Sequence, residues 1–152
     1  MSTTVTGQST EAMVATVMGI YEAFGRGDVP AILDVLADDV TWDGDWADSF
    51  AQRDAAITYL TPRRGVNQVA EFFAAAAELT IHDFQVGDVL VGANRVAVMV
   101  VMDASVPSGG RYRDEEVHLW TLGAAGRVTA LRHYTDTAKH LAAARGEDTT
   151  TR

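Results

Sequence analysis

The chain has 152 residues and a hydrophobic fraction of 47%, which fits one globular domain with a core of ordinary size. It contains no cysteine, so disulfide bonds and thiol catalysis are excluded. The net charge of −9 argues against nucleic acid and anionic membranes as partners, and no apolar run approaches the roughly 18 residues of a membrane helix.

Both ends of the chain are polar. We expect a flexible N-terminus over residues 1–9, a single domain over residues 10–144 and a flexible tail over residues 145–152. The opening sequence MSTTVTGQST lacks the basic and apolar segments of a signal peptide, so the expected location is the cytoplasm.

Apolar residues at helical spacing predict three helices in the first half of the chain. The first begins at Thr10, Asp28 is placed to cap the second, and Gly65 opens the third. Between the second and third helices, residues 40–42 are predicted to form a short strand. Residues 43–64 then form a long loop of the kind that often borders a pocket.

Four strands are predicted next, at about residues 80–90, 95–106, 111–122 and 127–135, before a last short helix that Asp136 caps. The turns between the strands are short, so the strands form an antiparallel meander. Helices first and a meandering sheet after them predict an α+β fold with helices packed on one face of the sheet.

The predicted hairpin over residues 111–135 carries the strongest chemical signal. Alternation with a period of two places Glu116 and His118 on the same face of the first strand. A tight turn then sets Glu116 beside His133 and His118 beside Leu131. A carboxylate beside an imidazole on a half-buried face favours acid–base chemistry.

The same pairing, extended to the earlier strands, predicts which residues share that face. It sets Asp103 opposite both Asp114 and His82, and it sets Met99 opposite His118. Because a slip of one residue would move a whole strand to the other face, the set depends on the register. The predicted inner face carries His82, Phe84, Val86, Met99, Val101, Asp103, Asp114, Glu116, His118, Trp120, Leu131 and His133.

The opposite face of the sheet is expected to be apolar in its middle, at Val96, Val98, Val100, Val117 and Leu119. An exposed apolar sheet face predicts a homodimer that forms through it.

The order of these elements, together with IYEAFGRGD, ILDVLADDVTW, PRRG, HLWTLGAAGRV and RHYTD, resembles the SnoaL-like branch of the nuclear transport factor 2-like superfamily. The resemblance covers about residues 11–143. It implies a cone, in which a strongly curved sheet wraps over three helices and leaves a pocket at the open end. Members of the superfamily include ketosteroid isomerases, polyketide cyclases, limonene epoxide hydrolase-like enzymes and non-catalytic binding modules, and many pair through the outer sheet face.

The resemblance also implies where working residues lie. Ketosteroid isomerases place a tyrosine on the first helix, and Ile20 falls there with Tyr21 beside it. Their general-base aspartate follows the first strand, where Gly44 stands next to Asp43. Their protonated aspartate, which donates to an oxyanion, aligns with His118. The resemblance therefore implies that the site lies where it does in ketosteroid isomerases, although the residues of their mechanism are not all present.

Limonene epoxide hydrolases use an Asp-Arg-Asp set, and only part of it is matched. Asp103 aligns with one aspartate, while Val101 and His133 stand in place of the arginine and the other aspartate. This mechanism is also incomplete, although the positions of Asp103 and His133 agree with those of working residues in the family.

We therefore predict His133, Glu116, His118 and Asp103 as catalytic residues. Glu116 would fix the tautomer of His133, which acts as the general base, and His118 or Tyr21 would stabilise a developing oxyanion. The alternatives are an ordinary cross-strand pair for Glu116 and His133, a core histidine for His118, and a solvated rim for Asp103.

Aromatic and apolar side chains are expected to line the substrate pocket, with plain core packing as the alternative. They are Tyr21, Trp42, Tyr59, Phe84, Met99 and Trp120. The histidines lie on different strands without tight ligand spacing, so neither a metal nor another cofactor is expected. The predicted function is isomerisation, cyclisation, dehydration or hydrolysis of a small, largely apolar molecule. The alternatives are a non-catalytic binding module and a pure dimerisation domain with a collapsed pocket.

Overall fold

The computed structural model describes residues 9–44, 49–53 and 57–151. The helices are α1 (Thr10–Gly25), α2 (Val29–Leu33), α3 (Val66–Ala76) and α4 (Thr137–Ala144), with the 3-10 helices η1 (Phe50–Arg53) and η2 (Thr58–Leu60). The strands are β1 (Leu36–Trp42), β2 (Arg63–Arg64), β3 (Thr80–Val91), β4 (Arg95–Ser105), β5 (Arg111–Leu122) and β6 (Val128–Tyr134). None of the described helices is long and apolar enough to cross a membrane.

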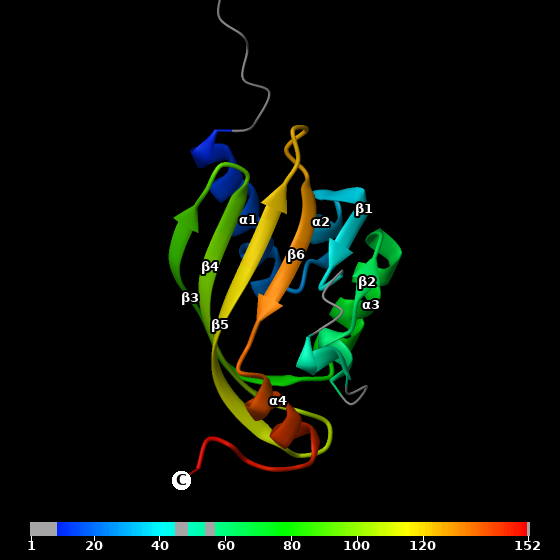
Figure 1. The fold of residues 1–152 in the computed structure, drawn as a ribbon, viewed down its shortest axis with the longest axis vertical. Helices are drawn as coiled ribbons and strands as arrows, with labels where there is room; N and C mark the ends of the chain where they lie inside the picture. Colours follow the sequence, from blue (N-terminus) through cyan, green and yellow to red (C-terminus); the bar gives the residue numbers. More distant parts are fainter. Residues whose placement is uncertain (1–8, 45–48, 54–56, 152) are drawn as a thin grey trace, which may run out of the picture.

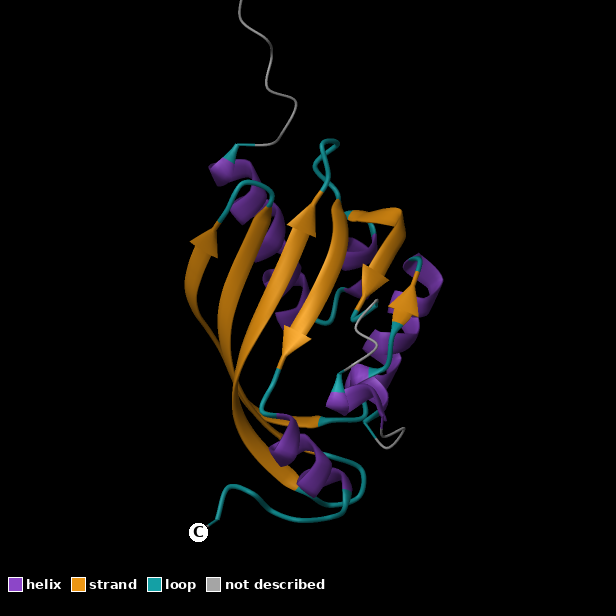
Figure 2. Ribbon diagram, viewed as in Figure 1, coloured by secondary structure: helices purple, strands orange, loops and turns teal. Residues whose placement is uncertain are grey.

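The strands form one curved sheet in the order β2-β1-β6-β5-β4-β3. Strands β3 to β6 are the predicted antiparallel meander, and β1 joins its edge parallel to β6. Figure 1 shows α1 and α2 behind the sheet and α4 at the end where β5 bends, and Figure 2 shows the curvature of the strands. The predicted α+β fold with a curved sheet is confirmed.

Local sequence explains where the first two helices begin. The Ser9 side chain accepts a hydrogen bond from the backbone N–H of Ala12 at the start of α1. Asp28 caps α2 in the same way by accepting from the N–H of Ala31. The apolar spacing of α1 predicted a stripe at Met13, Val17, Ile20 and Phe24. The first three are buried together with Ala23, while Phe24 is partly buried.

Strand β5 shows the strict alternation that its sequence predicts. Its even-numbered residues from Tyr112 to Leu122 are buried, and its odd-numbered residues are partly or fully exposed. Asp114, Glu116, His118 and Trp120 therefore all face the core, as expected from a period of two.

The predicted register between β4 and β5 is wrong by one residue. Val98 lies opposite His118, and Asp103 lies opposite Arg113. Met99 is consequently on the outer face with 41% of its surface exposed, while Val98 is fully buried. The cause is the turn, in which the N–H of Val106 donates to the carbonyl of Gly110, so three residues separate this pair where the sequence suggested a turn of four.

This shift changes several predicted positions together. Val96 and Val100, expected on the outer face, join Val98 in the core, whereas Val101 and Asp103 move to the outer side. Val117 and Leu119 keep their predicted outer positions, because the faces of β5 itself were assigned correctly.

Two further irregularities alter the predicted pairs. The β5–β6 ladder shifts at Thr121 and Leu122, so His133 lies opposite His118 instead of Glu116. The shift amounts to two residues, so the residues predicted on the inner face of β6 are correct, but their predicted partners on β5 are wrong. A second irregularity, between Ile81 and Asp83, leaves His82 exposed and bonded to Ser105 rather than facing inward.

The segment after α4 is held by backbone hydrogen bonds. The N–H of Arg111 donates to the carbonyl of Glu147, and the N–H of Thr149 donates to the carbonyl of Arg111. These bonds involve part of the tail that was expected to be flexible. Of the predicted flexible N-terminus, residues 1–8 lie outside the described residues.

Replacing Val98 with Ala should lower the free energy of unfolding by about 2 kcal/mol, because a buried side chain leaves a cavity. Met99→Ala should cost less than about 1 kcal/mol, because its side chain lies on the outer face. Urea denaturation of the two variants measures both values. A larger loss of stability in Met99→Ala than in Val98→Ala would support the register expected from the sequence instead.

Candidate functional site

A largely apolar cavity of about 80 Å³ lies between the inner face of the sheet and helices α1 and α3. Five of the six residues predicted to line a pocket do line it, namely Tyr21, Trp42, Tyr59, Phe84 and Trp120. Met99, the sixth, lies on the outer face because of the β4–β5 register. The polar atoms in the cavity wall come mainly from tyrosine, histidine and Glu116.

Three of these groups form a directed series of hydrogen bonds. The Tyr21 hydroxyl lies 2.7 Å from Nδ1 of His118, and Nε2 of His118 lies 3.1 Å from Oε1 of Glu116. A carboxylate only accepts, so Nε2 donates to Glu116 and Nδ1 accepts from Tyr21. The Trp120 indole N–H donates to the Tyr21 oxygen over 3.0 Å. The series therefore runs from Trp120 through Tyr21 and His118 to Glu116.

Burial and hydrogen bonds together set the protonation states along this series. It lowers the pKa of His118 more than Glu116 raises it, so the ring stays neutral. Burial also raises the pKa of Tyr21, so its hydroxyl keeps its proton. Burial alone would raise the pKa of Glu116 as well, but hydrogen bonds from His118 and His140 outweigh it and hold the pKa below its usual range.

His133 pairs with Asp43 instead of the predicted Glu116. The Asp43 carboxylate accepts from Nδ1 of His133 over 2.7 Å and from its backbone N–H over 2.7 Å. Asp43 has a φ of 55°, a conformation that is unfavourable for a residue with a side chain and is often found at functional sites. Burial lowers the pKa of His133, but the adjacent Asp43 carboxylate raises it further, so the net shift is upward.

This His133–Asp43 pair does not line the main cavity. Both residues border a smaller hollow beside η1. The His133 ring meets the His118 ring edge to face, with 4.8 Å between the centroids, and it also packs on Trp42 and Phe72, so residues of the cavity wall lie against it. The sequence contained a signal for Asp43, which directly follows the first strand beside the expected general-base position, but Asp43 was not predicted as a site residue.

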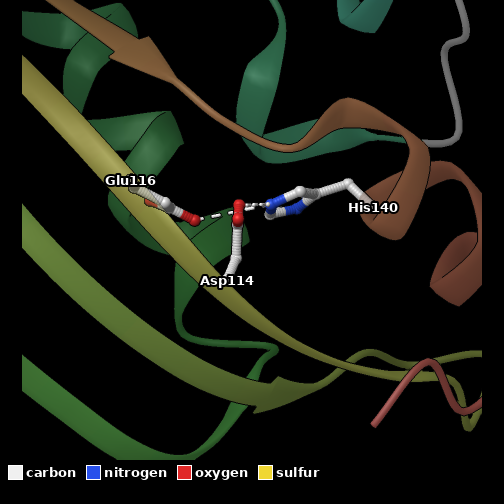
Figure 3. Close-up of side chains that lie close together, drawn as sticks. All are labelled: Asp114, Glu116 and His140. Carbon is white, nitrogen blue, oxygen red and sulfur yellow. Dashed lines mark hydrogen bonds and ion pairs between the residues drawn. The ribbon is translucent and has the colours of Figure 1, made fainter. Parts of the chain in front are cut away.

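His140 is a further buried residue that sequence reasoning missed. Its Nε2 lies 2.7 Å from Oδ2 of Asp114 and 3.4 Å from Oε2 of Glu116, and its Nδ1 lies 2.7 Å from the Tyr59 hydroxyl. Figure 3 shows the imidazole facing the two carboxylates. Burial lowers the pKa of His140, but hydrogen bonds to Asp114 and Glu116 raise it to about 9. A single histidine in a short terminal helix gives no sequence signal for this arrangement.

Asp103 lies away from the cavity, so its predicted place in the site is wrong. On the outer face it accepts two hydrogen bonds from Arg111, at 2.8 and 3.1 Å, and Arg113 lies 3.7 Å from it. The hydrogen bonds from Arg111 hold the pKa of Asp103 below its usual range. The structure thus brings His118, Glu116 and Tyr21 together at the cavity, places His133 behind them, and excludes Asp103.

The SnoaL-like domain model matches residues 17–131, and the chain belongs to this family. A search of curated proteins gives no match. Among solved structures, an NTF2-like protein from Burkholderia xenovorans LB400 is 27% identical with a TM-score of 0.75, covering 91% of this chain and 99% of its own.

Two mycobacterial structures share the fold at lower identity. Rv0760c from Mycobacterium tuberculosis, in complex with estradiol-17beta-hemisuccinate, is 20% identical with a TM-score of 0.61 and covers 81% of this chain and 92% of its own. The Δ5-3-ketosteroid isomerase from Mycobacterium sp. is 20% identical with a TM-score of 0.62 and the same coverage.

The raised pKa of His133 predicts a pH-dependent contribution to stability. Protonated His133 is stabilised by Asp43 in the folded chain, so the contribution is complete below the unfolded pKa of 6.5 and is lost as pH rises through the folded pKa. The difference in unfolding free energy between wild type and Asp43→Asn should therefore be largest in mild acid and shrink at alkaline pH. Urea denaturation at a series of pH values measures it, and a difference that does not change with pH would contradict this assignment.

Proposed function

We propose that this protein is a cofactor-independent enzyme that moves a proton on a small, largely apolar molecule bound in the cavity. The observation that carries the proposal is the series of Tyr21, His118 and Glu116 at the cavity wall. An activated hydroxyl, an imidazole that takes its proton, and a carboxylate that orients the imidazole form the general arrangement of acid–base and nucleophilic sites.

In this proposal Tyr21 exchanges a proton with the ligand. Nδ1 of His118 accepts the phenolic proton, and Glu116 stabilises the imidazolium that forms. The Trp120 N–H, which already donates to the Tyr21 oxygen, stabilises negative charge as it develops there. The apolar surroundings strengthen each of these interactions, because water does not screen them.

The ligand is proposed to carry a hydrogen-bond acceptor as well as an apolar body. The indole Nε1 of Trp42, a residue of the cavity wall, is buried without a hydrogen-bond partner among the described residues. A carbonyl or ether oxygen that reaches this N–H would remove the cost of leaving it unpaired.

His133 acts in this scheme as a positioning residue rather than as the general base expected from the sequence. Its ring packs edge to face on His118 and is itself held by Asp43. It thereby limits the rotation of His118 and keeps Nδ1 directed at Tyr21.

Binding of a small molecule is supported by the Mycobacterium tuberculosis structure, which has this fold and was solved with a steroid hemisuccinate. The cavity of about 80 Å³ favours a compact ligand here, because typical ligand sites measure roughly 300–1,000 Å³. The small volume also favours the alternative of a dimerisation domain with a collapsed pocket. The mutual hydrogen bond of Tyr21 and His118 favours the alternative of a non-catalytic binding module, since each group already satisfies the other.

Replacing Tyr21 with Phe should separate these two functions. With a small cyclic ketone in D₂O, we expect wild-type protein to accelerate deuterium exchange next to the carbonyl. The exchange rate with Tyr21→Phe should be lower by about 10²–10⁴-fold, because the hydroxyl is removed while the ring remains. Exchange is followed by NMR, and ligand binding by tryptophan fluorescence.

The matched control for this experiment is Tyr134→Phe on β6, which removes a hydroxyl from a residue that is 39% exposed and outside the cavity wall. This variant should accelerate deuterium exchange into the ketone as much as the wild-type protein does. Binding without any acceleration by the wild-type protein would leave the binding module as the function.

We also propose a homodimer that forms through the outer face of the sheet. In the observed register, Met99 pairs with Val117 and Ala97 with Leu119, which forms an apolar patch in the middle of that face. This patch replaces the one expected at Val96, Val98 and Val100. Apolar residues grouped on an exposed sheet face favour self-association.

The double variant Met99→Glu/Leu119→Glu should convert the dimer into a monomer, because like charges would face each other across the interface. Size-exclusion chromatography with light scattering measures the mass. Val86→Glu, on the edge strand β3 at a residue that is 40% exposed and pairs with the inward-facing Val100, is the control and should remain dimeric. A monomeric wild-type protein would overturn the proposed interface.

A further inference from the structure

A cluster of three buried side chains lies beside the cavity, on the side away from Tyr21. Asp114 and Glu116 are two residues apart on β5, so both point to the inner face, and α4 brings His140 against them. One possible ligand atom from each of the three residues lies within 4.8 Å of the others. Their exposed fractions are 1%, 5% and 1% in the order Asp114, Glu116 and His140.

Two carboxylates of this cluster are buried side by side. Within the described part of the chain, Asp114 and Glu116 are bonded by the imidazoles of His140 and His118 and by the backbone N–H of Asp136, and by no lysine or arginine. Two carboxylates removed from water this close together are costly unless a cation lies between them.

Nε2 of His140 faces the two carboxylates, and because a carboxylate only accepts, this nitrogen carries a proton in the absence of a metal ion. The Nε2–H of His140 is directed at both carboxylates, at 2.7 Å to Asp114 and 3.4 Å to Glu116. A divalent cation that replaces this proton would balance the two carboxylates, with the proton released to solvent. One imidazole nitrogen and two carboxylate oxygens are ligands that suit zinc, manganese and iron(II).

Each of the three side chains is also held from outside the cluster. The Tyr59 hydroxyl bonds Nδ1 of His140, His118 bonds the other oxygen of Glu116, and the backbone N–H of Asp136 donates to Asp114. Outer partners of this kind fix the tautomer and direction of metal ligands. They hold the three side chains so that Nε2 of His140 faces Oδ2 of Asp114 and Oε2 of Glu116.

We propose that Asp114, Glu116 and His140 form a binding site for one divalent transition-metal ion. Glu116 and His140 also line the cavity, so a coordination position on that side is open to a ligand in the cavity. The proposal does not depend on the proton transfer assigned to Tyr21, because metal binding is measured without any substrate.

The test is titration of tag-free, chelator-treated protein with Zn²⁺ by calorimetry and with Co²⁺ by visible absorption. We expect one ion per chain. His140→Gln and Asp114→Asn should each weaken binding by about 100-fold or more, because each removes one of three ligands. Tyr59→Phe keeps all three ligands and removes only an outer partner, so it should weaken binding by about 10–100-fold.

Asp103→Asn is the matched control, because Asp103 is also a carboxylate of the sheet but bonds Arg111 on the outer face. It should bind the ion as tightly as wild type. Circular dichroism checks that each variant is folded. Failure of the wild-type protein to bind one ion per chain at millimolar Zn²⁺ or Co²⁺ would overturn the proposal, and so would unchanged binding by folded His140→Gln or Tyr59→Phe.

Discussion

The burial of Glu116 inside an otherwise apolar wall is the constraint on which the inner face depends. A carboxylate removed from water is costly unless charged or polar donors hold it. His118 and His140 supply these donors, one to each oxygen. Because His118 is bonded to Tyr21 of α1 and His140 belongs to α4, this single buried charge connects the sheet to helices from both ends of the chain.

The same constraint explains why chemistry can be assigned to the cavity at all. Polar groups in an apolar interior must satisfy one another, and here they do so in a fixed direction, from Trp120 through Tyr21 to His118. The proposed proton transfer rests on this directed series of donors and acceptors. The second buried pair, His133 and Asp43, supports this series from behind through the contact between the two imidazole rings.

The fold could be predicted because its signals are local. Caps such as Asp28, the stripe on α1 and the alternation on β5 each involve a few neighbouring residues. The partners across the sheet could not be predicted in the same way. They depend on the number of residues in a turn and on bulges, and a turn one residue shorter after Val106 moved Met99 and Asp103 from the inner to the outer face.

The amino-acid sequence by itself indicated the family through its resemblance to known proteins. Its periodicity also determined the order of the elements and the inward direction of Glu116 and His118, because periodicity is a property of neighbouring residues. Only the tertiary structure decided their partners. It joined His133 to Asp43 and His140 to Asp114, residues 90 and 26 positions apart, and it moved Asp103 to the outer face. Such pairs arise from chain packing and from the need to satisfy buried charge, which no short stretch of sequence records.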